Sequence, residues 1–165
     1  MSLYDKVKSF FIRVFGHSTP QVLIKMLVEN PKLMPSKAHW DDSGYDLRSA
    51  EIKPIIIKPG ETTIIPCGFA MEIPAGYEAQ IRPRSGLAIK HGITVLNTPG
   101  TVDCGYRGEV KVILTNFGKN DFKIAYTNRI AQMVISKVPD VSLISVSKLH
   151  QSGRNENGFG SSGTN

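Results

Sequence analysis

The segment Arg82-Pro83-Arg84-Ser85-Gly86 places two cations, a hydroxyl group and a glycine within five residues. A strand is predicted over 77–82, and a short helical turn over 85–90 with Ser85 as its cap. Backbone N–H groups at the start of a helix point outward and attract anions. Arg84 and Ser85 can add charge-assisted hydrogen bonds to phosphate oxygens. The segment is therefore a candidate phosphate site, and the alternative is a turn with exposed arginines.

A second segment, Asn97 to Glu109, contains three glycines and one proline, which predicts a hairpin-like excursion between two strands. Glycine lets the backbone approach a ligand closely, so exposed N–H and C=O groups here could pair with the edge of a base. Asp103 and Tyr106 lie three residues apart at the bend and could share one pocket. The alternative is that Asp103 only forms the turn, as aspartate in glycine-rich turns often does.

Three other segments are weaker when taken alone. Residues 42–47 and 128–133 could each be a turn or a strand end with outward polar side chains. After Gln151 the chain reads SGRNENGFGSSGTN, which has too few apolar residues to offset the entropy of ordering and is predicted to be mobile on its own. A tail that closes over a ligand would use Arg154 on an anion and Phe159 on a flat ring.

Many short strands must position these segments. Apolar residues alternate with polar ones at 77–82, 110–114 and 122–126, which is the period of half-buried strands. Regular spacing with Pro and Gly between the segments predicts an all-β sandwich or barrel. Further strands are predicted at 22–28, 52–57, 62–65, 69–73, 93–96, 130–138 and 141–146.

The bulk composition narrows the class of protein. The 165 residues fit one domain with a substantial core. No apolar run approaches the roughly 20 residues of a transmembrane helix, and the two cysteines match no metal or disulfide spacing. A cytoplasmic protein without membrane association is therefore expected. The net charge of +6 could indicate a nucleic-acid partner, but the cations are spread along the chain, so none is expected.

The two ends of the chain differ from its middle. Residues 1–20 mix phenylalanines with lysines and predict an N-terminal extension that is amphipathic. It could contact a membrane or a partner, or simply pack on the protein itself. The predicted organisation is an extension over 1–20, a β domain over 21–150 and a flexible arm over 151–165.

Five strings become informative through their order: SGYDLRSA, RPRSGLA, NTPGTVDCGYRGEV, NRIAQM and RNENGFGSSG. They closely resemble the five ordered motifs of the trimeric dUTPase family, over roughly residues 22–163. The resemblance implies an all-β, jelly-roll-like β-barrel subunit and a homotrimer whose active sites draw on more than one chain. It also implies hydrolysis of dUTP to dUMP and pyrophosphate, which removes dUTP and supplies dUMP for thymidylate synthesis.

Carried over by position, the resemblance makes Asp103 the carboxylate that orients and activates the water that attacks the α-phosphorus. Mg²⁺ would be held by the substrate phosphates and by waters, with no direct protein ligand, and Asp46 would act on it through a water. Substrate binding would fall to Arg84, Ser85, Gly86, Asn97, Thr101, Val102, Tyr106, Lys111, Gln132, Arg154, Phe159, Gly160, Ser161 and Ser162.

The same positions imply selectivity for uracil and deoxyribose. Asn97 and the backbone of 101–103 would pair with uracil, whereas cytosine would leave buried polar groups unpaired and the thymine methyl would find no space. Tyr106 would pack on deoxyribose, where a 2′-hydroxyl would clash. In the tail, Arg154 would clamp phosphate and Phe159 would stack on uracil. The chain departs from common family residues at Gly105, Asn128, Asn155 and Asn157, which puts a local contact and the dynamics of the arm in doubt.

Two other functions stay open at this point. A dCTP deaminase, or a bifunctional enzyme of the same fold, would need other groups around the pyrimidine C4. A non-catalytic regulator that responds to nucleotide would have no need for an intact Asp103 or Arg84. The Tyr106 motif and the glycine-rich tail favour dUTP hydrolysis over the deaminase, and the intact Asp103, Arg84, Arg154 and Phe159 favour it over the regulator.

Overall fold

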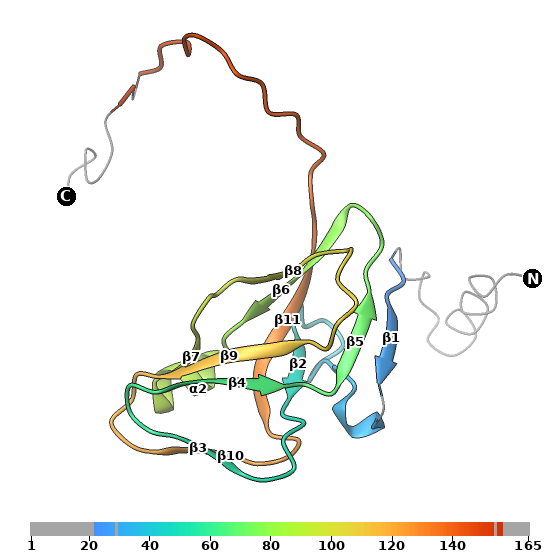
Figure 1. The fold of residues 1–165 in the computed structure, drawn as a ribbon, viewed down its shortest axis with the longest axis vertical. Helices are drawn as coiled ribbons and strands as arrows, with labels where there is room; N and C mark the ends of the chain where they lie inside the picture. Colours follow the sequence, from blue (N-terminus) through green and yellow to red (C-terminus); the bar gives the residue numbers. More distant parts are fainter. Residues whose placement is uncertain (1–21, 29, 154, 157–165) are drawn as a thin grey trace, which may run out of the picture.

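The computed structural model describes residues 22–28, 30–153 and 155–156, and this part of the chain consists mainly of short strands (Figure 1). The all-β expectation is confirmed. No helix in these ranges is both long and apolar enough to cross a membrane. The predicted extension at 1–20 lies outside the described residues. The elements, in chain order, are β1 (Lys25–Val28), the 3-10 helix η1 (Pro31–Leu33), β2 (Tyr45–Arg48), β3 (Ile55–Ile57), β4 (Thr62–Pro66), β5 (Phe69–Glu72), β6 (Tyr77–Arg82), α2 (Ser85–His91), β7 (Ile93–Val95), β8 (Gly100–Val102), β9 (Lys111–Asn116), β10 (Phe122–Ile124) and β11 (Arg129–Lys137).

A four-stranded sheet of order β2-β11-β6-β8 carries the segments that the sequence singled out. β11 is an interior strand of this sheet, and it pairs antiparallel with β2 on one side and with β6 on the other. The register places Gln132 opposite Asp46 on β2 and opposite Arg82 on β6. Three motifs that are far apart in sequence therefore meet at one end of this sheet. The remaining sheets have the orders β4-β9-β7, β1-β5 and β10-β3.

The core side chains occupy the alternate positions that the sequence pattern selects. Ala79 and Ile81 on β6 are buried, as are Val112 and Leu114 on β9. Successive side chains of a strand point to opposite faces, so burying one set exposes the other to solvent or to a site. This alternation fixes the register of β6, because a shift by one residue would turn its apolar set outward.

The helix α2 is fixed at its far end by a close backbone contact. Gly92 caps the helix in the left-handed conformation, with φ of 68°. A Cβ on Gly92 would approach the backbone N of Gly118 to 2.5 Å, so only glycine fits there. The buried side chain of Asn116 accepts a hydrogen bond from Gly118 N at 2.8 Å and donates to Ile57 O at 2.8 Å, which holds that turn in place. The C-terminal end of α2 is thereby held against the turn at 116–118.

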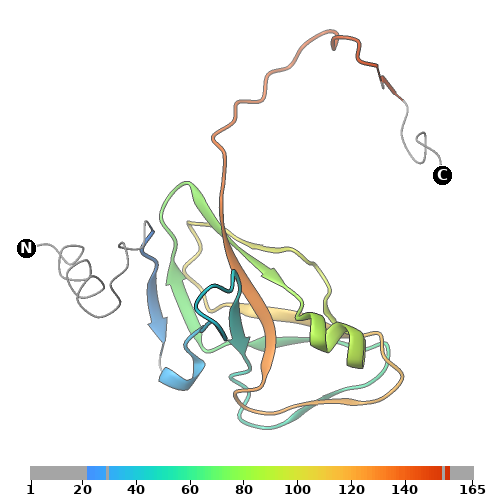
Figure 2. The ribbon, with the colours of Figure 1, turned by 180° about the vertical axis from the view of Figure 1, so that it is seen from behind.

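Residues 138–153 extend away from the body, as the two opposite views agree (Figures 1 and 2). The predicted strand at 141–146 is wrong for the single chain, which forms no strand after β11 in the described residues. Its apolar side chains remain exposed, with Leu143 at 96% and Ile144 at 81%. A strand needs a partner for its backbone groups, and no strand among the described residues pairs with this segment.

Thr127 sits in the turn before β11 with a positive φ of 63°, which a β-branched residue rarely adopts. Its backbone is held there because its N–H donates to Ser49 O at 2.8 Å and its carbonyl accepts from the Arg48 guanidinium at 3.2 Å. Asn128 adds a side-chain oxygen that accepts from Ala125 N at 2.8 Å. The turn leads directly into the first residue of β11.

Replacing Thr127 by glycine is expected to stabilise the protein by about 0.5–1 kcal/mol, because relief of the left-handed strain exceeds the entropy that glycine adds to the unfolded chain. Chemical denaturation measures this change. The matched control is Thr63→Gly in β4, where φ is not positive and a loss of about 1 kcal/mol is expected. Equal losses for the two variants would show that Thr127 is not strained.

Candidate active site

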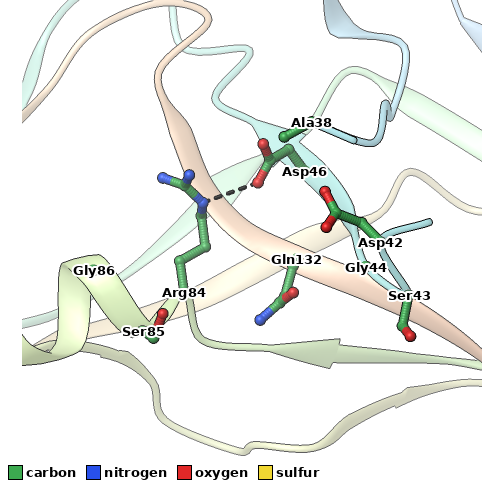
Figure 3. Close-up of a pocket in the computed structure, with 9 residues that line it drawn as sticks. All are labelled: Ala38, Asp42, Ser43, Gly44, Asp46, Arg84, Ser85, Gly86 and Gln132. Carbon is green, nitrogen blue, oxygen red and sulfur yellow. Dashed lines mark ion pairs between the residues drawn. The ribbon is translucent and has the colours of Figure 1, made fainter. Parts of the chain in front are cut away.

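A cavity of about 300 Å³ opens at the end of the four-stranded sheet (Figure 3). The loop before β2 supplies Asp42 and Ser43 on one side, and the start of α2 supplies Ser85 and Gly86 on the other. Gln132 lies between the two sides. The full lining is Ala38, Asp42, Ser43, Gly44, Asp46, Arg84, Ser85, Gly86 and Gln132.

Two arginines contact one carboxylate at the edge of this cavity. The Nε atom of Arg84 lies 2.9 Å from Oδ1 of Asp46, and an NH1 atom of Arg129 lies 3.1 Å from Oδ2. The Asp46 side chain is only 13% exposed, so its contacts with the arginines are screened less than surface ion pairs are. The two guanidinium groups outnumber this one carboxylate, so Arg84 keeps charge to offer to an anionic ligand, although Asp42 also lines the cavity.

Gln132 has its side chain fixed by its neighbours. Its amide nitrogen donates to Pro83 O at 2.9 Å, which ties β11 to the segment that links β6 and α2. Gly44 lies so close to the amide of Gln132 that a Cβ there would overlap its Oε1. The glycine of the SGYD motif is therefore needed for space at this contact, and Gln132 is held toward the cavity.

The start of α2 differs in one detail from the prediction. Arg84, with an extended backbone, is the residue that precedes the first helical turn, and it makes no side-chain capping bond. Ser85 is the first helical residue, so the prediction that it caps the helix is wrong. Its hydroxyl and the backbone of Gly86 are exposed and line the cavity instead. Both groups can serve as hydrogen-bond donors to an anion.

The predicted hairpin forms after β7, with β8 paired to β6. Gly100 is buried, and a Cβ there would meet the Asn97 side-chain nitrogen at 3.1 Å. Asp103 follows β8 and is exposed. The turn closes with Tyr106 N donating to Asp103 O at 3.1 Å, and the Tyr106 hydroxyl donates to Glu109 O at 3.0 Å. Asp103 and Tyr106 thus lie at one bend, and a pocket shared by their side chains stays a prediction.

The sequence model of the dUTPase family matches residues 30–163. This chain belongs to the dUTPase family. A deoxyuridine 5'-triphosphate nucleotidohydrolase from Gloeothece citriformis is 54% identical over 136 residues, which cover 82% of this chain and 92% of that protein. The solved dUTPase of Staphylococcus bacteriophage 80alpha with dUpNHpp is similar with a TM-score of 0.78 and 27% identity, over 86% of this chain and 99% of that one.

A second phage structure extends the comparison. The dUTPase of phage phi11 of S. aureus is similar in fold with a TM-score of 0.69 and 24% identity, over 76% of this chain and 97% of that one. That structure is of a variant and reveals the coordination of a structural Mg(II) ion in the phage protein. The dUTPase-type β fold predicted from the motifs is therefore confirmed.

In the single dUTPase chain, the predicted site residues fall into two separate groups. Arg84, Ser85, Gly86 and Gln132 line the cavity, with Asp46 at its edge. The second group is the hairpin set, which does not line it: Asn97, Thr101, Val102, Asp103 and Tyr106, with Lys111 exposed at the start of β9.

The register of β8 explains this separation. Val102 pairs with Ala79, near the start of β6, whereas Arg84 lies past the other end of that strand. Five residues of chain, about 17 Å when extended, therefore separate Ala79, the pairing partner of Val102, from Arg84, and Asp103 lies one residue beyond Val102. A water held by Asp103 must also lie within hydrogen-bond reach of that carboxylate. The separation is the main geometric fact that any mechanism has to accommodate.

Five of the predicted substrate-binding residues belong to the C-terminal arm. Arg154, Phe159, Gly160, Ser161 and Ser162 lie outside the described residues. Conversely, the sequence interpretation did not assign Asp42, Ser43 or Gly44 to substrate, although they line the cavity, nor Ala38. Ser43 and Gly44 belong to the first motif string, SGYDLRSA. Their closeness to Asp46 in the sequence could have indicated that they line the same site. Ala38 carries no such signal.

The cavity can accommodate a hydrated cation without providing a metal cage. In the ranges that the structure describes, no group of three or more His, Cys, Asp or Glu side chains is placed to hold a metal. Asp42 and Asp46 both present carboxylates to the cavity. Oδ2 of Asp42 accepts from His39 N at 2.8 Å, so this residue is also fixed by its own turn. Such carboxylates can accept hydrogen bonds from waters on a Mg²⁺ ion.

The buried cysteine plays no part in this chemistry. Burial, with a smaller contribution from the Glu109 carboxylate, raises the pKa of the Cys67 thiol to about 12. The thiol therefore stays protonated at neutral pH, and a protonated thiol is neither a good nucleophile nor a metal ligand. Cys67 acts as a core side chain, fully buried among apolar residues.

Proposed function

We propose that this protein hydrolyses dUTP to dUMP and pyrophosphate, and so removes dUTP and supplies dUMP for thymidylate synthesis. The observation that carries the proposal is the cavity in which Arg84, Ser85 and Gln132 meet, with Asp42 and Asp46 beside them. Membership of the dUTPase family supports the choice of substrate. A cytoplasmic location fits this activity and is part of the proposal.

The proposed reaction is attack by water on the α-phosphorus. The carboxylate of Asp103 accepts a proton from the water as the new oxygen–phosphorus bond forms. The bond between the α-phosphorus and its bridging oxygen breaks, and pyrophosphate leaves with the electron pair. Arg84 and the N–H groups at the start of α2 stabilise the charge that develops on the phosphates. Gln132 is fixed so that its amide can contact a phosphate or the water.

Mg²⁺ is the proposed cofactor, coordinated by the substrate phosphates and by waters. The carboxylate pair Asp42 and Asp46 supports this assignment, because it offers acceptors to metal-bound waters without enclosing a metal. When bound, the ion would neutralise charge on the leaving pyrophosphate. Asp46 meanwhile keeps its contact with Arg84, which orients that guanidinium.

A homotrimer with shared sites is the proposed assembly. The separation of Asp103 from the cavity supports it, because the hairpin of one chain can complete the cavity of another. The exposed apolar side chains of 138–150 also support it, since they require a surface to cover them. The arm at 151–165 would then close over the site, with Arg154 on phosphate and Phe159 on uracil.

The test is pyrophosphate release from dUTP, dTTP, dCTP and UTP, each with Mg²⁺. Rapid release from dUTP is expected, with the other three slower by about 10² or more. Cytosine would leave buried polar groups of the site unpaired, the thymine methyl would find no space, and the 2′-hydroxyl of UTP would clash at Tyr106. Equal turnover of all four nucleotides would contradict the proposed specificity. Ammonia release from dCTP would instead support the deaminase alternative.

A further inference from the structure

Arg129 contacts Asp46 from outside the cavity and is not among the cavity-lining residues. It is the first residue of β11, at an irregularity in the pairing of β11 with β2. The hydrogen bond from Ser49 N to Asn128 O, at 2.9 Å, fixes the backbone just before it. Its own carbonyl accepts from an NH1 of Arg84 at 3.4 Å. Arg129 therefore contacts both members of the Asp46–Arg84 pair.

The geometry of the pair shows what Arg129 contributes. Asp46 has two oxygens, and each takes one arginine: Oδ1 takes Arg84 and Oδ2 takes Arg129. A carboxylate that is free to turn prefers to bind one guanidinium through both oxygens, in the bidentate mode. With Oδ2 occupied, Asp46 holds Arg84 through its Nε atom and does not engage its terminal nitrogens in that way.

We propose that Arg129 is a positioning residue that acts through Asp46. By occupying one oxygen of this carboxylate, it limits Asp46 to a single contact with Arg84. This leaves NH2 of Arg84, and the N–H of NH1 that does not donate to Arg129 O, for the triphosphate. Arg129 also keeps the summed charge of the Arg84, Asp46 and Arg129 side chains positive. The inference rests on the proposed function, because it names what prepares Arg84 for the phosphates of that substrate.

The test compares Arg129→Gln and Arg129→Lys, using steady-state kinetics with dUTP and calorimetric binding of dUpNHpp. Arg129→Gln is expected to raise KM and to weaken binding of the analogue by about tenfold, the size typical for a lost charged hydrogen bond, with kcat changed less. Arg129→Lys keeps the cation and should recover most of the binding. Lys53→Gln removes an exposed lysine outside the cavity and controls for the change in net charge.

A double-mutant cycle with Asp46→Asn separates positioning from direct contact. If Arg129 acts through Asp46, then Arg129→Gln should weaken dUpNHpp binding by no more than about twofold in the Asp46→Asn background. An undiminished tenfold effect in that background would overturn the proposal, and so would unchanged binding in Arg129→Gln. Should Arg129→Gln not fold, Arg129→Met, which also removes the cation, and its cycle with Asp46→Asn apply the same criterion. Failure of the unaltered protein to bind dUpNHpp or hydrolyse dUTP would instead refute the proposed function.

Discussion

Replacing Asp103 by asparagine is expected to lower kcat for dUTP by about 10³-fold, within the range known for loss of a general base. The amide keeps the shape of the side chain but cannot accept a proton from water. Asp103 is exposed at the bend of its hairpin, and its backbone oxygen closes the turn, so the substitution should leave the fold intact. Single-turnover kinetics measure the loss, and calorimetry with dUTP should show nearly unchanged binding.

Asp121→Asn is the matched control for this prediction. Asp121 is also an exposed aspartate, in the turn before β10, and it does not line the cavity. Its replacement removes the same charge and should leave turnover unchanged. If Asp103→Asn abolished binding and not the chemical step, the residue would have a structural or binding role, and the general-base assignment would be wrong.

Mixing two inactive variants, Asp103→Asn and Arg84→Ala, is expected to restore part of the activity. Asp103→Asn lacks the proposed base, and Arg84→Ala lacks the main cation of the cavity. If each site combines the hairpin of one chain with the cavity of another, random assembly leaves some sites with both intact residues. After co-refolding of equal amounts, half of the cavities and half of the hairpins are intact. Because the chains combine at random, roughly a quarter of the activity of the unaltered protein should be recovered.

The complementation is measured as pyrophosphate release after refolding, against each variant refolded alone. Both single variants should stay near background. Absence of any recovery, in mixtures that sedimentation shows to be mixed oligomers, would mean that Asp103 and Arg84 of the same chain form the site. A monomeric protein that is fully active would exclude shared sites altogether.

The alternation of apolar and polar residues, with Pro and Gly between the segments, was sufficient to predict most of the strands. β6 and β9 follow the period of two that Ala79, Ile81, Val112 and Leu114 define, because burial of one face fixes register. The short helix after β6 was also predicted, within one residue of its end. Its cap was wrong, because Arg84 already has the extended backbone of a capping position and Ser85 is helical.

Other features depend on contacts that a linear pattern does not encode. The Asp46–Arg129 pair joins residues that only the register of β2 and β11 brings together. The apolar residues at 141–146 have the composition of a strand, but a strand also needs a partner, and the chain carries this segment away from the body. The separation of the hairpin from the cavity follows from the pairing of β8 with β6, which the sequence does not fix.

Turnover of dUTP in ¹⁸O-labelled water tests the central claim most directly, because a single experiment reports both the activity and the bond that is cleaved. Mass spectrometry of the products should show one labelled oxygen in the phosphate of dUMP and none in pyrophosphate. Label in pyrophosphate would place the attack on the β-phosphorus, where the proposed role of Asp103 does not apply. No conversion of dUTP would contradict the proposed function itself.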